Sequence, residues 1–568
     1  MMPLRRDSET QPLLHLTASP PRTQTHWLPK RFQCIPSKGA LLVLFWTLIV
    51  GAIYKTVTSG FTVAVHTYLS LSQSDVHANI VEVKAVFGIH LIFALASIFY
   101  PLAGFIADIC VGRHKVVIIS LLLLLCGFVS FSIGSALYFS KIIETHRDTV
   151  TKGVKQFAAV VIIGFLLTFV GFSGYQSNYI QLGLDQLQDA PSHSLGLFVH
   201  FVEWFMIIGL TLLQVIISWC TCNYDQYIID FLLSLPFLYV LLLLVLVLIG
   251  WWKRRWFRTE PARHNPYRTV FQVFKFVWKH KYPFQYSAFT HGEDGEPSRF
   301  DFAKERYGGP FTTEQVEDVK TFIKILIVLL TLGPVFVLVV PSGLLYAKFV
   351  QHVTNYHRDN VSCSWEWIVL NTGILKYSVA SLFFPVYIWL LYSALRNYIP
   401  RIFTRLCIWI LVLVVCVTSM VLIDLFGHIL YHHREHHGMV CMFTQMVAAN
   451  ETTTLGMHWA VIILPTVLQA IAPMMIITTT FEFISAQSPH SMKGLLVGVF
   501  FSIMGFYQFI GSLMLFPFSL PHIWNNIGKS TPIVNCGFGY LLFTCAIGTA
   551  SLLLFLVAAK RYQYRDRQ

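Results

Sequence analysis

Histidines are concentrated in one short stretch, HILYHHREHH, which runs from His428 to His437. Its spacings, H-x-x-x-H-H and H-x-x-H-H, are those with which some membrane enzymes hold two irons. Pairs four residues apart, such as His428 and His432, could instead bind zinc. Imidazoles titrate near neutral pH, so the run could also sense pH, and a solvated helix end is the remaining interpretation. Which of these interpretations applies depends on where the rest of the fold places the run.

Ionisable residues inside apolar stretches are the second group that could do chemistry. Lys55, Glu203 and Lys376 lie within such stretches, where an unpaired charge costs about 2.5 to 3.5 kcal/mol on insertion scales, so each is a functional candidate. We expect Lys55 and Glu203 to pair across the N-terminal half, either for function or as a purely structural pair. Asp424 lies near the end of its apolar stretch and is expected to be solvated.

Composition predicts the elements that must position these residues. Hydrophobic residues make up 55% of the 568 residues and charged residues 12%, and the mean hydropathy is +0.61. These values indicate an all-α membrane protein that crosses the bilayer many times. Apolar runs long enough to span about 30 Å of hydrocarbon predict twelve transmembrane helices, centred on 40–69, 80–107, 115–139, 156–182, 195–219, 226–252, 321–350, 365–394, 403–430, 457–484, 494–518 and 537–559.

The spans are arranged as six, a soluble insert, and six more. We expect a cytosolic N-terminal tail at 1–38, a six-helix bundle at 39–252, a cytosolic linker at 253–320, a second bundle at 321–560 and a cytosolic tail at 561–568. The first 38 residues lack an apolar core, so they are not expected to be a cleaved signal peptide. In the linker, apolar residues at helical spacing predict an amphipathic helix over 270–278, lying at the membrane interface or packed on the bundle. Thr312 and Gln315 predict a capping box that opens the seventh span.

Basic residues are concentrated in alternate connections, which the positive-inside rule assigns to the cytosol. They are Arg113, Lys115, Lys253, Arg254, Arg255, Arg258, Arg396, Arg401, Arg405, Lys493, Lys560, Arg561, Arg565 and Arg567. Both termini are therefore expected in the cytosol. The basic connection at 140–155 disagrees, and we give it less weight because acidic residues are interleaved there. Asn360 and Asn450 lie in N-x-S/T sequons on the opposite, non-cytosolic side and are candidate glycosylation sites.

This topology bears on the histidine run, because it places the run at the non-cytosolic end of the ninth span. Di-iron chemistry needs histidines that converge from several helices on the cytosolic face, and His352, His357 and His458 stand isolated in the sequence. We therefore expect no enzyme, no bound metal and no cofactor. Adventitious zinc binding, pH sensing and a solvated helix end remain open for the run.

The stretch AGFIADICVGRHKVV, from Ala103 to Val117, carries a third candidate site. Gly104 allows close helix approach and Gly112 allows a tight turn. Asp108 and Arg113 place charges at the cytosolic mouth, where they could hold the two halves together in one state. We expect these four residues to form a cytosolic gate.

Together with three further stretches, this one resembles signatures of the proton-dependent oligopeptide transporter family of the major facilitator superfamily. The others are GYQSNYIQLGLDQL, RFDFAKERYGGPFTTEQVEDVK and FEFISAQSPHSMKGLLVG, the last of which contains Glu482. The resemblance is strongest to animal lysosomal peptide and histidine transporters and covers nearly all of 40–560. It implies the twelve-helix 6+6 fold, alternating access around a midplane site, and proton-coupled uptake of di- or tripeptides or histidine.

The sequence departs from the family at the coupling motif. The span-one acids and tyrosines of E-x-x-E-R-F-x-Y-Y-G are missing, and Gln176 replaces the lysine that partners them. Pro473 falls where the family carries the acid for a peptide's amino terminus. His90 keeps the interval to Asp108 at which animal relatives place a proton-accepting histidine. With Lys55 and Lys376 present and those acids absent, charge alone favours a neutral or anionic solute.

These features predict a secondary active transporter whose partners are a small solute (di- or tripeptide, histidine or small anion), protons and the lipid bilayer, with no nucleic acid. The tail sequence ETQPLL contains Glu9, Leu13 and Leu14 in the acidic dileucine pattern that sorting adaptors bind. It favours an endosomal or lysosomal membrane over the plasma membrane. The alternative is a non-transporting or weakly transporting endolysosomal nutrient sensor or scaffold, favoured by the loss of the coupling motif.

Overall fold

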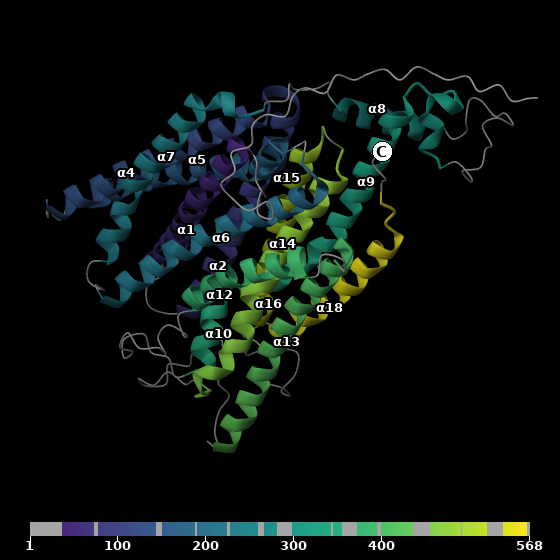
Figure 1. Ribbon diagram of the computed structural model, residues 1–568. Helices are drawn as coiled ribbons and strands as arrows, with labels where there is room; N and C mark the ends of the chain where they lie inside the picture. Colours follow the sequence, from purple (N-terminus) through teal and green to yellow (C-terminus); the bar gives the residue numbers. More distant parts are fainter. Residues whose placement is uncertain are drawn as a thin grey trace, which may run out of the picture.

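The computed structural model is all-α apart from two isolated β-bridges in the part that it describes (Figure 1). The described residues are 37–72, 78–143, 150–187, 190–223, 228–258, 266–280, 298–341, 343, 345–354, 372–394, 399–434, 455–489, 491–519 and 538–564. In parts of some helices, including 58–72 and 78–86, only the backbone is described, and the side chains of Lys55 and Thr56 are likewise outside the described set.

The N-terminal half, purple to blue in Figure 1, is built from long helices. They are α1 (Lys38–Ser72), α2 (Ala78–Ser97), α3 (Phe99–Ile106), a π-helical turn (Ala107–Val111), α4 (Arg113–Ile143), α5 (Val150–Asp185), α6 (Ser192–Asn223) and α7 (Ile228–Trp252). The second predicted span is thus divided among α2, α3 and the π-helical turn. A π turn changes the direction in which side chains point and often marks a functional site, and here it carries Asp108.

The C-terminal half, teal through green to yellow, contains α9 (Thr313–Leu332), the 3-10 segment Gly333–Val339, α10 (Tyr346–Val353), α12 (Thr372–Trp389) and a π turn (Leu390–Ala394). It continues with α13 (Ile402–Arg434), the 3-10 segment Trp459–Ile462, α14 (Ile463–Gln487), α15 (Lys493–Leu513), α16 (Phe516–Ser519) and α18 (Phe538–Arg561). Prolines stand inside α7, α12 and α14 at Pro236, Pro385 and Pro473, where each removes one backbone hydrogen bond.

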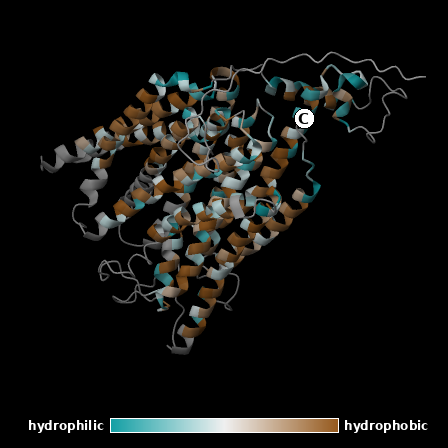
Figure 2. Cartoon of the chain, viewed as in Figure 1, coloured by the Kyte–Doolittle hydropathy of each residue, from teal (hydrophilic) through white to brown (hydrophobic). Residues whose placement is uncertain are grey.

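Apolar residues dominate the helices of both halves (Figure 2). Eleven helical segments among the described residues are long and apolar enough to cross a membrane, so the prediction of a multi-pass membrane protein is confirmed. For α1 the described apolar portion is shorter, Lys38–Tyr54. The predicted count of twelve is therefore not confirmed by the described residues.

The insert, which separates the two halves in the sequence, is described over 253–258, 266–280 and 298–312, and its helix α8 (Pro266–Lys279) lies near the C-terminus at the top of Figure 1. This helix starts four residues before the predicted amphipathic helix and ends one residue after it. One face of α8 buries Val273 and Val277 in a small apolar core. On the other face Trp278 is 86% exposed. The helix thus packs on the start of α9 and leaves the Trp278 side chain exposed.

Polar contacts fix this insert to α9. Thr312 and Gln315 form the predicted capping box, with both reciprocal hydrogen bonds present. Asp301 accepts hydrogen bonds from Ser298 and Lys320 and forms an ion pair with Lys304. Burial alone would raise the pKa of Asp301, but these hydrogen bonds outweigh it and hold the pKa well below its usual range.

Glycines allow the closest helix crossings in the N-terminal half. A Cβ atom at Gly51 of α1 would lie 2.4 Å from the carbonyl oxygen of Met206 in α6, and one at Gly209 would lie 2.0 Å from that of Leu48. Only hydrogen fits at such distances, so α1 and α6 pack backbone to backbone, as membrane helices with small interface residues do. These two contacts also fix the antiparallel register of the two helices.

Candidate functional site

The segment expected to form the gate brings the two halves together. A Cβ atom at Gly104 would lie 2.2 Å from the carbonyl oxygen of Gly494 in α15, and one at Gly498 would lie 2.4 Å from that of Tyr100. The backbones of the α3 and α15 segments therefore touch. Gly112 has a φ of 87°, a left-handed conformation that favours glycine, and it ends the π turn just before α4.

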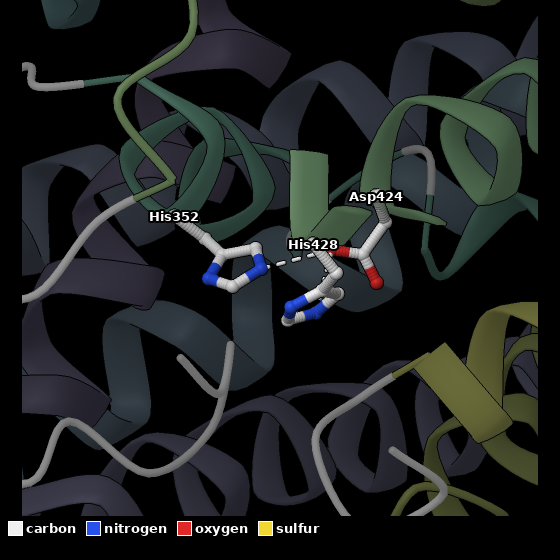
Figure 3. Close-up of side chains that lie close together, drawn as sticks. All are labelled: His352, Asp424 and His428. Atoms are coloured by element: carbon white, nitrogen blue, oxygen red, sulfur yellow. Dashed lines mark hydrogen bonds and ion pairs between the residues drawn. The ribbon is translucent and has the colours of Figure 1, made fainter. Parts of the chain in front are cut away.

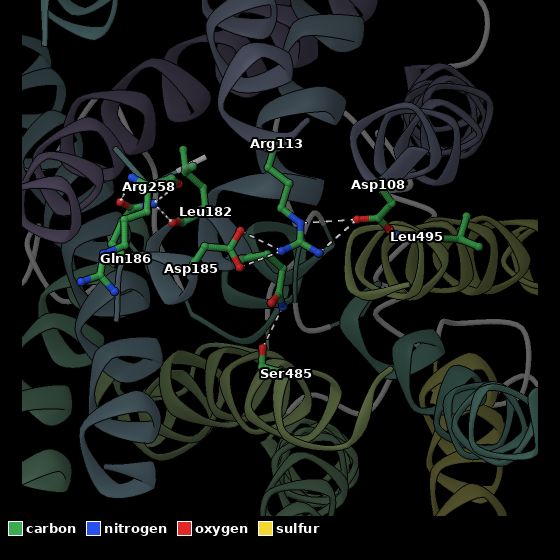
Figure 4. A network of polar contacts seen from close by, with 9 residues as sticks. Asp108, Arg113, Leu182, Asp185, Gln186, Arg258, Ser485 and Leu495 are labelled. Atoms are coloured by element: carbon green, nitrogen blue, oxygen red, sulfur yellow. Dashed lines mark hydrogen bonds and ion pairs between the residues drawn. The ribbon is translucent and has the colours of Figure 1, made fainter. Parts of the chain in front are cut away.

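Asp108 is the polar centre of this contact (Figure 4). Its side chain is 0% exposed. One carboxylate oxygen accepts hydrogen bonds from the backbone N–H of Leu495, 3.1 Å away, and from the hydroxyl of Tyr267, also at 3.1 Å. Leu495 is the third residue of α15, whose own N-cap, Met492, makes no side-chain capping bond. Asp108 therefore caps a helix of the opposite half.

Arg113 holds the other oxygen of Asp108. Its Nη2 lies 3.2 Å from Asp108 Oδ1, while Nη1 lies 2.8 Å from both oxygens of Asp185 at the end of α5. The guanidinium thus supplies the positive charge that balances two buried carboxylates. Burial and the Asp108 charge raise the pKa of Tyr267, so its hydroxyl remains a neutral donor that ties α8 to the same group.

A second polar contact between the halves lies at Glu482 of α14. Arg405 of α13 binds it bidentately, at 2.6 and 2.9 Å. His200 of α6 places Nε2 4.0 Å from the same carboxylate, and its Nδ1 lies 3.3 Å from the hydroxyl of Tyr392. Gln181 of α5 adds a 2.8 Å hydrogen bond to Ser485 one turn further along α14. The sequence predicts that Arg405 lies in a connection between spans. That prediction was wrong, because Arg405 lies in the first turn of α13 and is only 5% exposed.

Glu203 of α6 lies deep in the N-terminal half. It is 6% exposed and accepts a hydrogen bond from the hydroxyl of Tyr179 in α5. Its expected partner, Lys55, is described only as backbone within α1. The antiparallel register fixed by Gly51 and Gly209 places Lys55, one turn beyond Gly51, beside Glu203. This backbone register is compatible with the predicted pair, which stays a prediction.

The remaining membrane candidates are placed as follows. Gln176, at the position of the lysine in the resembled family, is buried and accepts a 2.8 Å hydrogen bond from Tyr100. His90 is buried in α2. Lys376 is partly buried in α12, with its amine 5.9 Å from the centre of the Tyr377 ring.

The start of the histidine run differs from what was expected. Asp424 is 1% exposed, so its predicted solvation was wrong. The Nε2 atom of His352 in α10 lies 2.9 Å from Asp424 Oδ1, so His352 is not isolated in space. His428 is partly buried beside them. The side chains of His432 and His433, and His436 and His437 altogether, lie outside the described residues, as do Glu9, Leu13, Leu14, Asn360 and Asn450.

Sequence reasoning missed Tyr179, His200, Arg405 and Tyr267 as members of these sites. Each makes its contact with a residue of a different helix. The separation along the chain runs from 24 positions, between Tyr179 and Glu203, to 282 positions, between His200 and Glu482, so local spacing carries no signal. The usable signal was the resemblance around Glu482 and Asp108, because a buried acid in a membrane span requires a donor nearby.

Comparisons with known proteins agree with this fold. No model of a known protein family matches the chain. Solute carrier family 15 member 3 of Rattus norvegicus is 22% identical over 99% of this chain and 96% of its own length. Protein NRT1/PTR family 5.16 of Arabidopsis thaliana is 23% identical over 46% of this chain. The chain spans about half the length of that protein, 47%, and of its paralogue 5.15, 50%.

Solved structures give the same answer at the level of fold. The POT family transporter PepTSo covers 93% of this chain and 99% of its own, with a TM-score of 0.63 and 15% identity. An auto-inhibited POT family peptide transporter covers 93% and 98%, with a TM-score of 0.62 and 14% identity. A xylose symporter of the major facilitator superfamily has a TM-score of 0.51. The chain thus has the major facilitator fold. Two of these solved structures are POT family transporters, and the sequence relatives are NRT1/PTR and solute carrier family 15 members, as the sequence resemblance predicted.

Proposed function

We propose that this protein is a secondary active transporter that works by alternating access, with its two halves rocking around a site between them. The observation that carries the proposal is the Asp108 carboxylate, which belongs to one half and caps α15 of the other. A contact of this kind is strong enough to hold a closed state and weak enough to be broken in a transport cycle. Its sequence relatives and fold neighbours include transporters.

Closure on the face that carries the insert would then depend on two latches. The first is the Asp108 contact with α15, and the second is the group of Glu482, Arg405 and His200. The first latch crosses between the halves through the hydrogen bond from Leu495 N–H to Asp108. The second crosses through His200, whose Nε2 lies 4.0 Å from Glu482, whereas the ion pair of Arg405 and Glu482 lies within the C-terminal half. Water would solvate both carboxylates when the halves separate. Tyr267 connects the first latch to the insert, so movement of α8 would accompany opening. These contacts favour a transporter over the alternative of a static scaffold, and we propose no enzymatic activity.

Proton coupling is assigned to Glu203, with Lys55 as its partner. A carboxyl group at this depth is costly to keep charged unless a cation or donors compensate it. Tyr179 supplies one donor, and the register of α1 and α6 supports Lys55 as the cation. Protonation of Glu203 would release Lys55, which could then bind a carboxylate of the solute. His90 is the second candidate proton acceptor.

The proposed solute is small and carries a carboxylate: a di- or tripeptide, histidine, or a small organic anion. The peptide class is suggested by a fold neighbour that is named as a peptide transporter. Lys55 and Lys376 would attract the carboxylate, whereas Pro473 replaces the acid that would bind a peptide's amino terminus. We further propose cytosolic termini, glycosylation at Asn360 and Asn450, and an endosomal or lysosomal location reached through adaptors that bind Glu9, Leu13 and Leu14.

The test is uptake by purified protein in proteoliposomes, from a labelled mixture of dipeptides, histidine and small anions, with and without an inward proton gradient. We expect one class to accumulate above equilibrium only when the gradient is imposed. Glu203→Gln should abolish gradient-driven accumulation, whereas Glu305→Gln, an exposed acid of the insert, should not. Equal accumulation without a gradient would contradict proton coupling, and no uptake of any class would contradict transport of these solutes.

A further inference from the structure

The start of the histidine run forms a compact cluster with a residue from another helix (Figure 3). Asp424 and His428 stand one turn apart on α13, and His352 faces them from the last turn of α10. Because α9 leaves the insert and leads into α10, this cluster lies at the end of the C-terminal half opposite the insert. It takes no part in the latches or in the proposed proton coupling.

The ligand atoms of the three side chains converge on one point. His352 Nε2 lies 2.9 Å from Asp424 Oδ1, and His428 Nε2 lies 3.6 Å from the same oxygen. One ligand atom from each residue lies within 4.8 Å of those of the others. The side chains are 3%, 2% and 12% exposed in the order His352, Asp424, His428. Among the described residues, His428 Nε2 is buried without a hydrogen-bond partner.

We propose that His352, Asp424 and His428 bind a zinc ion. Two imidazoles and one carboxylate are ligands that zinc prefers, at about 2.0 to 2.2 Å each, with a fourth position left for water. Tetrahedral geometry at these bond lengths separates the ligand atoms by about 3.3 to 3.5 Å. The observed 2.9 and 3.6 Å separations lie on either side of this value, so small side-chain rotations suffice. The ion would also give the unpartnered His428 nitrogen a ligand bond.

Zinc at this position would fasten together three parts of the C-terminal half. His352 belongs to α10 and the other two ligands to α13. The carbonyl oxygen of His352 also accepts a hydrogen bond from the backbone N–H of Leu455, at 2.9 Å, just before α14 begins. Leu455 packs against Gly427, the neighbour of His428. A bound ion would therefore stiffen this end of the half, whichever solute the protein carries.

The experiment uses the full-length protein, purified in detergent, stripped with a chelator and then titrated with zinc. We expect one tightly held zinc per chain by metal analysis, and a rise in the thermal unfolding midpoint when zinc is added. His352→Gln should weaken this binding at least about 10-fold and abolish the thermal shift. Asp424→Asn should do the same, and it is the second variant in case the first fails to fold.

The matched control removes the rest of the histidine run. A variant with His432, His433, His436 and His437 changed to alanine should still bind zinc as tightly as the unchanged protein. Loss of the tight zinc in this control, with retention in His352→Gln, would assign the metal to the run and overturn the proposal. Absence of tight zinc from the unchanged protein would overturn it as well.

Discussion

Replacing Asp108 by asparagine tests the first latch with the smallest change of shape. The side chain keeps its size, and its remaining carbonyl oxygen can still accept from Leu495 N–H. It loses the negative charge that faces the start of α15 and the guanidinium of Arg113. Arg113 retains its two hydrogen bonds to Asp185. The substitution therefore weakens the contact between the halves and leaves the N-terminal half held together.

The magnitude follows from the contact that is lost. A charge at a helix N-terminus contributes about 0.3 to 1 kcal/mol, and a hydrogen bond to a charged acceptor contributes up to about 1 kcal/mol more than one to a neutral acceptor. Their sum, about 1 to 2 kcal/mol, should shift the ratio of closed to open molecules by a factor of about 5 to 30. The shift is toward opening on the face that carries the insert.

The assay is the distance between two spin labels, one in each half on that face. Lys115 in the first turn of α4 and Ala486 near the end of α14 are both exposed and can be changed to labelled cysteines in a cysteine-free background. We expect Asp108→Asn to increase the long-distance population, and Glu305→Gln to leave it unchanged. An unchanged distance distribution in folded Asp108→Asn protein would refute the latch.

Three further predictions concern other parts of the chain. Gly104→Ala should prevent closure on the insert face, because its Cβ would lie 2.2 Å from the carbonyl oxygen of Gly494. Uptake should fall at least about 10-fold. Membrane insertion should be unchanged, as measured by protein yield after size-exclusion chromatography. Arg405→Ala leaves the partly buried Glu482 without its bidentate partner and should lower stability by about 3 kcal/mol, measured as a lower thermal midpoint. An unchanged midpoint would contradict the pair's structural role. Asp301 has a pKa below its usual range, so the stability it confers is complete above its unfolded pKa, at about pH 4, and is lost as the pH falls below that value. The protection factors of amides in the insert, which are corrected for the pH dependence of intrinsic hydrogen exchange, should therefore fall on acidification toward pH 3, and less so in Asp301→Asn.

The sequence predicts most of the fold because the membrane imposes simple rules. Apolar runs of about 20 residues have to be helices in a bilayer, and eleven of the expected runs appear as such helices. The local sequence was also sufficient to predict the capping box of Thr312 and Gln315, because this motif depends only on two residues three positions apart. The gate segment could be recognised because its turn and its close contact both require glycine.

Contacts between distant helices were beyond sequence reasoning. Arg405 resembles a loop cation in the sequence, and only its position against Glu482 makes it a buried partner. Asp424 lies near a span end, where solvation is usual, but α10 folds back and covers it with His352. The burial of a polar group depends on which helix packs beside it, and single-sequence patterns do not contain that information. The pairing of Lys55 with Glu203 stays a prediction.

The most direct test of alternating access is to lock the insert face reversibly and measure transport. Gln181 and Ser485 face each other across the halves, so both can be changed to cysteine and joined by a short, reducible methanethiosulfonate cross-linker. We predict that solute uptake into proteoliposomes stops when the cross-link forms and returns when a reductant cleaves it, with neither single-cysteine variant affected. Undiminished uptake by fully cross-linked protein would contradict the account.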